Sequence, residues 1–172
     1  MWLLIFILAD LGVIFDTDVD RSAAVDGNGK EISRNRIVAL AAALIAKEHP
    51  GTTVVTDSIT SDELTEYLEQ CLGLKHLRFK RGYKNVITKS QELNKQGIDS
   101  QLAIETSGHA AYKENFFLDD GAYLATKIVI KTAQLKMQGE GINVLLSSLK
   151  EPKEVMEIRF PFERLYDTTP LI

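Results

Sequence analysis

The sequence predicts an α/β fold in which a mixed sheet is flanked by helices. Runs rich in β-branched residues alternate with segments of helical periodicity along most of the chain, as expected when strands and helices follow one another. The chain of 172 residues has about the length of one average domain, with a short flanking piece. Its 45% hydrophobic and 26% charged residues are ordinary for a protein that buries a core.

Strands are expected where apolar and β-branched residues lie between turn signals. These segments are residues 11–15, 21–25, 30–32, 52–56, 75–80, 101–104 and 155–160. The second and third should form a hairpin around Asp26-Gly27-Asn28-Gly29, because Gly and Asn tolerate positive φ.

Helices are expected where apolar residues recur every three or four positions. These segments are residues 33–49, 60–72, 83–96, 119–137 and 142–150. Ser33 is the expected N-cap of the first, and Thr60 with Glu63 fits a capping box for the second. Asp119 and Asp120 should cap the long fourth helix and complement its dipole.

Charge and cysteine content exclude several classes of protein. A net charge of -4 provides no electrostatic footprint for nucleic acid, which is therefore not an expected partner. Cys71 is the only cysteine, so disulfide frameworks and cysteine-based zinc sites are excluded. We expect Cys71 to be a buried structural thiol and the compartment to be reducing, either the cytoplasm or an organelle interior.

The chain opens on an apolar segment, Met1 to Ala9, which Asp10 ends. This is well short of the roughly 20 residues of a membrane-spanning helix, and no targeting signal is recognised in it. A strand is the better interpretation. Such a strand with an unpaired edge would mediate a homodimer or dock onto another chain.

Three aspartates, Asp16, Asp18 and Asp20, occupy every second position directly after the first interior strand and before Arg21. Carboxylates crowded at one strand end repel one another unless a cation neutralises them, and such oxygen ligands suit Mg²⁺. An EF-hand loop is excluded because its sixth position would be Arg21 instead of Gly, and its twelfth Gly27 instead of Glu. A solvated acidic turn is the structural alternative.

A second polar loop, Glu105-Thr106-Ser107-Gly108-His109, follows the strand expected at 101–104. A carboxylate beside a small hydroxyl can accept from neighbouring sugar hydroxyls, and Gly108 would allow close backbone approach. Taken alone, the same residues could form a turn or a helix cap. By itself, His109 is more readily explained as a satisfied loop or core histidine.

Three segments in this order resemble the α-D-phosphohexomutase family of phosphoglucomutases and phosphomannomutases. They are residues 15–21, the turn Arg81-Gly82-Tyr83-Lys84 and the loop 105–109. The resemblance implies that Asp16, Asp18 and Asp20 bind Mg²⁺. It also implies that hexose phosphate is the ligand and that the residues near it are Arg21, Gly82, Lys84, Glu105, Ser107 and His109.

The resemblance further implies a domain organisation. Residues 1–34 would be a remnant of the family's second domain, residues 35–160 its third domain, and residues 161–172 a tail. The family is a set of isomerases that perform intramolecular phosphoryl transfer. Because no counterpart of its phosphoserine loop or of its fourth-domain phosphate loop occurs in the sequence, we expect a truncated or partial enzyme without full turnover of its own.

Two alternatives remain open at this point. One is a non-catalytic binding or self-association module derived from a mutase. The other is a haloacid-dehalogenase-like phosphatase, in which Asp16 would be a covalent nucleophile. The loop at Glu105 has no role in the phosphatase interpretation, and Asp20 stands where that motif has Thr or Val.

Overall fold

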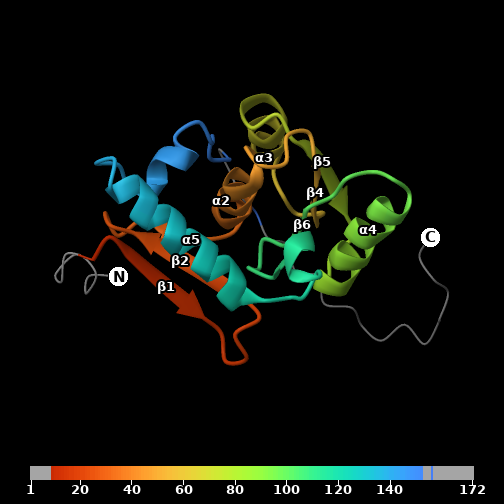
Figure 1. Ribbon diagram of the computed structural model, residues 1–172, viewed down its shortest axis with the longest axis horizontal. Coiled ribbons are helices and arrows are strands. Elements are labelled where there is room, and N and C mark those ends of the chain that lie inside the picture. The colour runs from red at the N-terminus through yellow and green to blue at the C-terminus, as the bar shows by residue number, and fades with distance from the viewer. Residues whose placement is uncertain (1–8, 153–155, 157–172) are drawn as a thin grey trace.

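The computed structural model describes residues 9–152 and residue 156, and it shows two sheets on either side of a central helix (Figure 1). The central helix is α2 (Asn35–Ile45), whose apolar residues are buried from Ile37 to Ala42 and again at Ile45. They pack with core residues from both sheets, among them Ile32 and Leu102. The mixed α/β fold expected from the sequence is confirmed.

The first sheet is antiparallel and contains strands β1 (Leu11–Phe15), β2 (Ser22–Asp26) and β3 (Glu31–Ile32) in that order. The hairpin between β2 and β3 closes as expected. The Asp26 carboxylate accepts the backbone N–H groups of Asn28 and Lys30, both at 2.9 Å, which satisfies turn donors that would otherwise lack a partner.

The second sheet has the strand order β5-β4-β6-β7. Strands β4 (Thr53–Asp57), β5 (Lys75–Phe79) and β6 (Leu102–Ile104) are parallel, and β7 (Ala110–Tyr112) is antiparallel to β6. The carboxyl ends of the three parallel strands therefore meet at one edge. Strand β7 was not predicted, because its three residues are too short a run to show alternation.

Helices cover both faces of this second sheet. On one face, α4 (Tyr83–Lys95) buries Val86 and Leu93 against Val55 and Ala103. On the other face lie α2 and the α3 segment (Asp62–Glu66). Helix α5 (Gly121–Lys136) spans the first sheet and α2, as Figure 1 shows.

Two expected N-caps were wrong. The cap of α3 is Ser61, whose hydroxyl accepts the N–H of Leu64 at 3.2 Å, while the Thr60 hydroxyl donates to the Asp57 carbonyl instead. Residue Arg34, not Ser33, precedes α2, and it has a positive φ of 52°. Asp120 does cap α5 by accepting the Tyr123 N–H at 2.9 Å.

The structure also differs from other local predictions. The helix expected through Leu72 continues from α3 as a π-helix, η1 (Tyr67–Cys71), and Cys71 is exposed rather than buried. The helix expected after Gly141 is a 3-10 helix, η3 (Ile142–Leu146). A further 3-10 turn, η2 (Lys113–Asn115), precedes α5.

Three expectations fall outside the described residues, apart from Ala9 and Met156: the apolar opening strand with its proposed dimer contact, the final strand at 155–160 and the tail at 161–172. In the part of the chain that the structure describes, no helix has both the length and the apolar character needed to cross a bilayer.

Candidate functional site

The carboxylate cluster lies in the loop that leaves β1. One oxygen from each of Asp16, Asp18 and Asp20 lies within 4.8 Å of the others, so the alternation seen in the sequence becomes a single concentration of negative charge. The loop turns back sharply at Val19, whose φ is 64°. This left-handed residue brings Asp20 round toward the second sheet.

Arg21 holds Asp16 in place. The guanidinium Nε lies 2.6 Å from Asp16 Oδ2, and the Arg21 backbone N–H donates to Oδ1 at 3.2 Å. The side-chain hydrogen bond from Arg21 lowers the pKa of Asp16 to about 2. Asp16 is therefore ionised at neutral pH, and its orientation is set from within the loop.

The second polar loop is the turn between β6 and β7. The Gly108 N–H donates to the Glu105 carbonyl at 3.0 Å, and the Glu105 N–H donates to the His109 carbonyl at 2.9 Å. The Glu105 carboxylate accepts the backbone N–H of Gly82 at 2.6 Å and the Ser107 hydroxyl at 3.2 Å. Glu105 thus joins the β6–β7 turn to the β5–α4 turn.

Glycine at two positions lets the carboxylate loop approach its neighbours. A Cβ added to Gly108 would lie 2.6 Å from the Ser22 carbonyl oxygen, and one added to Gly121 would lie 2.7 Å from the Arg21 carbonyl carbon. The Ser22 N–H donates to the Gly108 carbonyl at 3.3 Å, and Arg21 forms an antiparallel bridge with His109. The two predicted loops therefore lie against each other.

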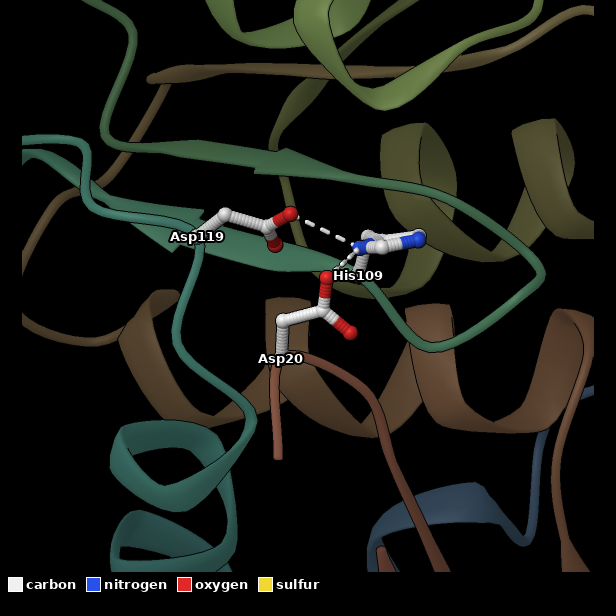
Figure 2. Close-up of side chains that lie close together, drawn as sticks. All are labelled: Asp20, His109 and Asp119. Atoms are coloured by element: carbon white, nitrogen blue, oxygen red, sulfur yellow. Dashed lines mark hydrogen bonds and ion pairs between the residues drawn. The ribbon is translucent and has the colours of Figure 1, made fainter. Parts of the chain in front are cut away.

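His109 makes the side-chain contact between the loops (Figure 2). Its Nδ1 lies 2.7 Å from Asp119 Oδ2 and 3.7 Å from Asp20 Oδ2, and its ring stacks on Tyr83 with centroids 4.7 Å apart. Burial raises the pKa of both carboxyls, Asp20 and Asp119, while the nearby charge of His109 opposes that rise.

Two carboxylate oxygens of the site accept no hydrogen bond from the described residues, although Asp20 Oδ1 lies 3.8 Å from Arg21 Nε. Asp20 Oδ1 and Asp119 Oδ1 are both buried, and neither accepts a hydrogen bond from the described residues. An unsatisfied buried carboxylate oxygen is costly, and a bound cation removes that cost. The donor set fits a hard divalent cation held by Asp16, Asp18 and Asp20, because all the donor atoms are carboxylate oxygens.

Most of the residues predicted for the site lie together. Glu105, Ser107 and His109 lie on one turn, and Gly82 is joined to it through Glu105. Lys84 is exposed, with its Nζ 5.8 Å from the Tyr83 ring centroid.

Sequence reasoning assigned two neighbours of the site differently. Asp119 was expected to help cap α5, yet it contacts His109, while Asp120 alone accepts a helix N–H. Asp57 was not singled out, although it accepts hydrogen bonds from Thr106 in the Glu105 loop. Its only signal was a carboxylate at the end of a buried β-rich run.

Comparison with known proteins gives a consistent result. Residues 33–150 match the family described as phosphoglucomutase/phosphomannomutase, alpha/beta/alpha domain III. A phosphomannomutase/phosphoglucomutase of Pseudomonas syringae pv. tomato is 33% identical over 122 residues, which are 70% of this chain and 25% of that protein. A phosphoglucosamine mutase of Lactobacillus delbrueckii subsp. bulgaricus is 29% identical over 150 residues, covering 86% and 31% respectively.

Solved structures agree. A phosphoglucomutase/phosphomannomutase family protein from Burkholderia thailandensis has a TM-score of 0.72 and 27% identity, covering 87% of this chain and 31% of that one. A putative phosphomannomutase from Thermus thermophilus has a TM-score of 0.67 at 19% identity and covers 86% and 33%, which supports the fold.

These relatives give the phosphatase and binding-module alternatives no support, and the chain spans about a quarter to a third of the length of the proteins it matches. Since the family match covers most of the chain, it follows that this protein belongs to the phosphoglucomutase/phosphomannomutase family, which it matches in domain III.

Proposed function

We propose that this chain binds Mg²⁺ and a hexose phosphate in a phosphohexomutase-type site. The observation that carries this proposal is the contact between the two polar loops through Gly108, Ser22 and His109. That contact supports the proposal because three carboxylates that could bind a cation lie near a Glu-Ser pair suited to sugar hydroxyls.

The relatives support the choice of ligands. Those named above are described as mutases of phosphorylated sugars. An N-acetylphosphoglucosamine mutase from Aspergillus fumigatus, with a similar fold, was solved in complex with GlcNAc-6P and magnesium. We extend the magnesium and the class of phosphorylated hexoses to this chain.

Each loop has a defined part in the proposed site. Asp16, Asp18 and Asp20 would hold Mg²⁺, which supplies positive charge against a phosphoryl group in transfer. Arg21 orients Asp16 for that task and lowers the pKa of its carboxyl. Its own remaining N–H groups, like those of other arginines, match phosphate oxygens.

The sugar would lie against the other loop. Glu105 can accept hydrogen bonds from sugar hydroxyls while it still accepts those of the Gly82 N–H and the Ser107 hydroxyl, since a carboxylate has about four acceptor positions. Ser107 is exposed and can donate or accept. Asp119 fixes the His109 ring through Nδ1, and the exposed Lys84 is proposed to reach the phosphate.

Replacing Asp18 by asparagine should weaken Mg²⁺ binding by at least about tenfold without lowering stability, because Asp18 is exposed and is proposed as a direct ligand. Isothermal titration of the full chain with MgCl₂ measures the affinity. Asp62→Asn is the matched control, since the Asp62 side chain is 94% exposed and lies outside the site. Equal affinities in the two variants would contradict the metal assignment.

The hexose phosphate is tested by titrating glucose 1,6-bisphosphate into the chain with and without MgCl₂. We expect binding that strengthens at least severalfold with Mg²⁺, because the cation offsets repulsion between phosphate and the carboxylates. Glu105→Gln should weaken that binding by about tenfold, as expected for a hydrogen bond to a charged group. If wild type shows no heat with the bisphosphate at saturating Mg²⁺, the proposed function is wrong.

A further inference from the structure

A buried carboxylate that has no part in the proposed ligand contacts lies directly beneath the Glu105 loop. Asp57 is the last residue of β4, the strand between β5 and β6, and it is only 1% exposed. In the parallel register Asp57 pairs with Phe79 at the end of β5, and Thr56 pairs with Ile104 at the end of β6. Asp57 therefore sits between the two turns that Glu105 joins.

Both carboxylate oxygens of Asp57 accept hydrogen bonds from one residue of the loop, Thr106. The Thr106 hydroxyl donates to Oδ2 at 2.8 Å, and the Thr106 backbone N–H donates to Oδ1 at 3.3 Å. Two hydrogen bonds to a single residue fix its position and its rotation. Because Thr106 lies between Glu105 and Ser107, whatever fixes Thr106 also fixes where those two side chains leave the backbone.

The burial of Asp57 is costly by itself. Removal from water raises the pKa of its carboxyl, and the charge of Glu105 acts in the same direction, while the Thr106 hydrogen bonds and the charge of Arg81 oppose it. A neutral side chain of similar size would fill this position without that cost. The two hydrogen bonds to Thr106 are the compensating contacts of the carboxylate oxygens.

The loop is thus held from two sides. Asp57 holds Thr106 from within the sheet, and the Gly82 N–H holds the Glu105 carboxylate from the neighbouring turn at 2.6 Å. Rotation of Thr106 would shift the backbone of its neighbours, so we expect it to strain the hydrogen bonds that the Glu105 carboxylate accepts from Gly82 and Ser107. Small displacements of this kind are expected to weaken ligand contacts strongly, since each contact depends on hydrogen-bond geometry.

We infer that Asp57 is a positioning residue of the sugar site: through Thr106 it sets the direction in which Glu105 and Ser107 meet the ligand. This inference rests on the proposed function for the sugar contacts. A buried carboxylate that only braced the fold would contribute to stability alone, so affinity and stability must be measured separately.

The test compares Thr106→Val, which removes the hydroxyl at constant shape, with Thr106→Ser, which restores it. Glucose 1,6-bisphosphate is titrated into the full chain at saturating MgCl₂. We expect Thr106→Val to weaken binding by about fivefold and Thr106→Ser to return it to within about twofold of wild type. Thr132→Val is the matched control, since its buried hydroxyl donates to the Ile128 carbonyl in α5, and it should leave the affinity unchanged.

A second variant and a second measurement separate the positioning role of Asp57 from the proposed binding of the sugar. Asp57→Asn keeps the shape but loses one of the two acceptors, and it should weaken bisphosphate binding at least as much as Thr106→Val. Amide exchange, followed residue by residue without ligand, should accelerate at Gly82 and Gly108 in both variants, because these N–H groups donate within the held turns.

The outcomes are distinct. Wild-type affinity in Thr106→Val, or unchanged exchange at Gly82 and Gly108 in both variants, would overturn the positioning role. If wild type does not bind the bisphosphate while exchange accelerates as expected, the positioning of the loop stands and the proposed sugar function fails. If Asp57→Asn lowers the thermal stability as much as Thr132→Val does but leaves the affinity unchanged, Asp57 only stabilises the fold. That result would also overturn the inference.

Discussion

Replacing Gly108 by alanine is expected to lower the free energy of unfolding by about 3 kcal/mol and to disrupt the site. Gly108 has a φ of 99°, which L-residues rarely adopt, and the added Cβ would lie 2.6 Å from the Ser22 carbonyl oxygen. Two costs therefore add: backbone strain at Gly108, and a displacement of the Glu105 loop away from β2. The second cost separates the carboxylate loop from the Glu105 loop.

Urea unfolding measures the loss, and Gly97→Ala is the matched control. Gly97 also has a positive φ, of 79°, but an added Cβ there would meet no atom within 4 Å. The control should cost only about 1 kcal/mol, the strain alone. The Gly108 variant should also lose most of its Mg²⁺-dependent bisphosphate binding, whereas the control should keep it. Equal losses of stability in the two variants would show that the close approach to Ser22 has no energetic importance.

Acidification from pH 6.5 to pH 4 is expected to remove about 3 kcal/mol of stability through His76 alone. Burial, assisted by the charge of Arg78, lowers the pKa of His76 from 6.5 to about 4. The ring nitrogens lie 2.7 Å from the Thr56 hydroxyl and 2.8 Å from the Thr65 hydroxyl, which hold the neutral ring.

The direction of this change in stability follows from proton uptake by the unfolded chain. In the folded chain His76 stays neutral down to about pH 4, while in the unfolded chain it takes up a proton below about pH 6.5. Between these values the unfolded state binds more protons, so its stability relative to the folded state rises as the pH falls. The contribution of His76 is complete above pH 6.5 and is lost progressively toward pH 4.

Comparison of wild type with His76→Gln isolates this residue. Glutamine offers a donor and an acceptor to the two threonines but does not titrate, so its free energy of unfolding should fall less steeply between pH 7 and pH 4.5. Carboxyl groups titrate in both proteins, and their effect cancels in the difference. Parallel pH profiles would show that His76 is not the group responsible.

Several features that depend on neighbouring residues were predicted correctly, although the N-caps expected at Ser33 and Thr60 were not. The alternation of Asp16, Asp18 and Asp20 after an apolar strand placed three carboxylates in one loop, and the structure gathers them. The hairpin at Asp26 and the capping role of Asp120 follow from side chains that bond backbone groups two to four residues away. Such local hydrogen bonds leave a direct pattern in the sequence.

Features that depend on distant contacts were missed. Strand β7 exists because β6 supplies its pairing partner, and its three residues alone carry no periodicity. Asp57 and Thr106 are 49 residues apart, and nothing in either segment indicates the other. Asp119 was assigned to a cap because its neighbour Asp120 fits that role, while its contact with His109 accompanies an antiparallel bridge between Asp119 and Ala111 of β7.

The position of α2 has a consequence for how the chain loses its structure. Its buried side chains belong to the same core as Ala24 of the first sheet and Val54 of the second, so loss of the helix would uncover part of the apolar face of each sheet. Partial states with one sheet intact would expose that face to water, which is unfavourable. The two polar loops, although carried by different sheets, should therefore be lost in a single cooperative transition.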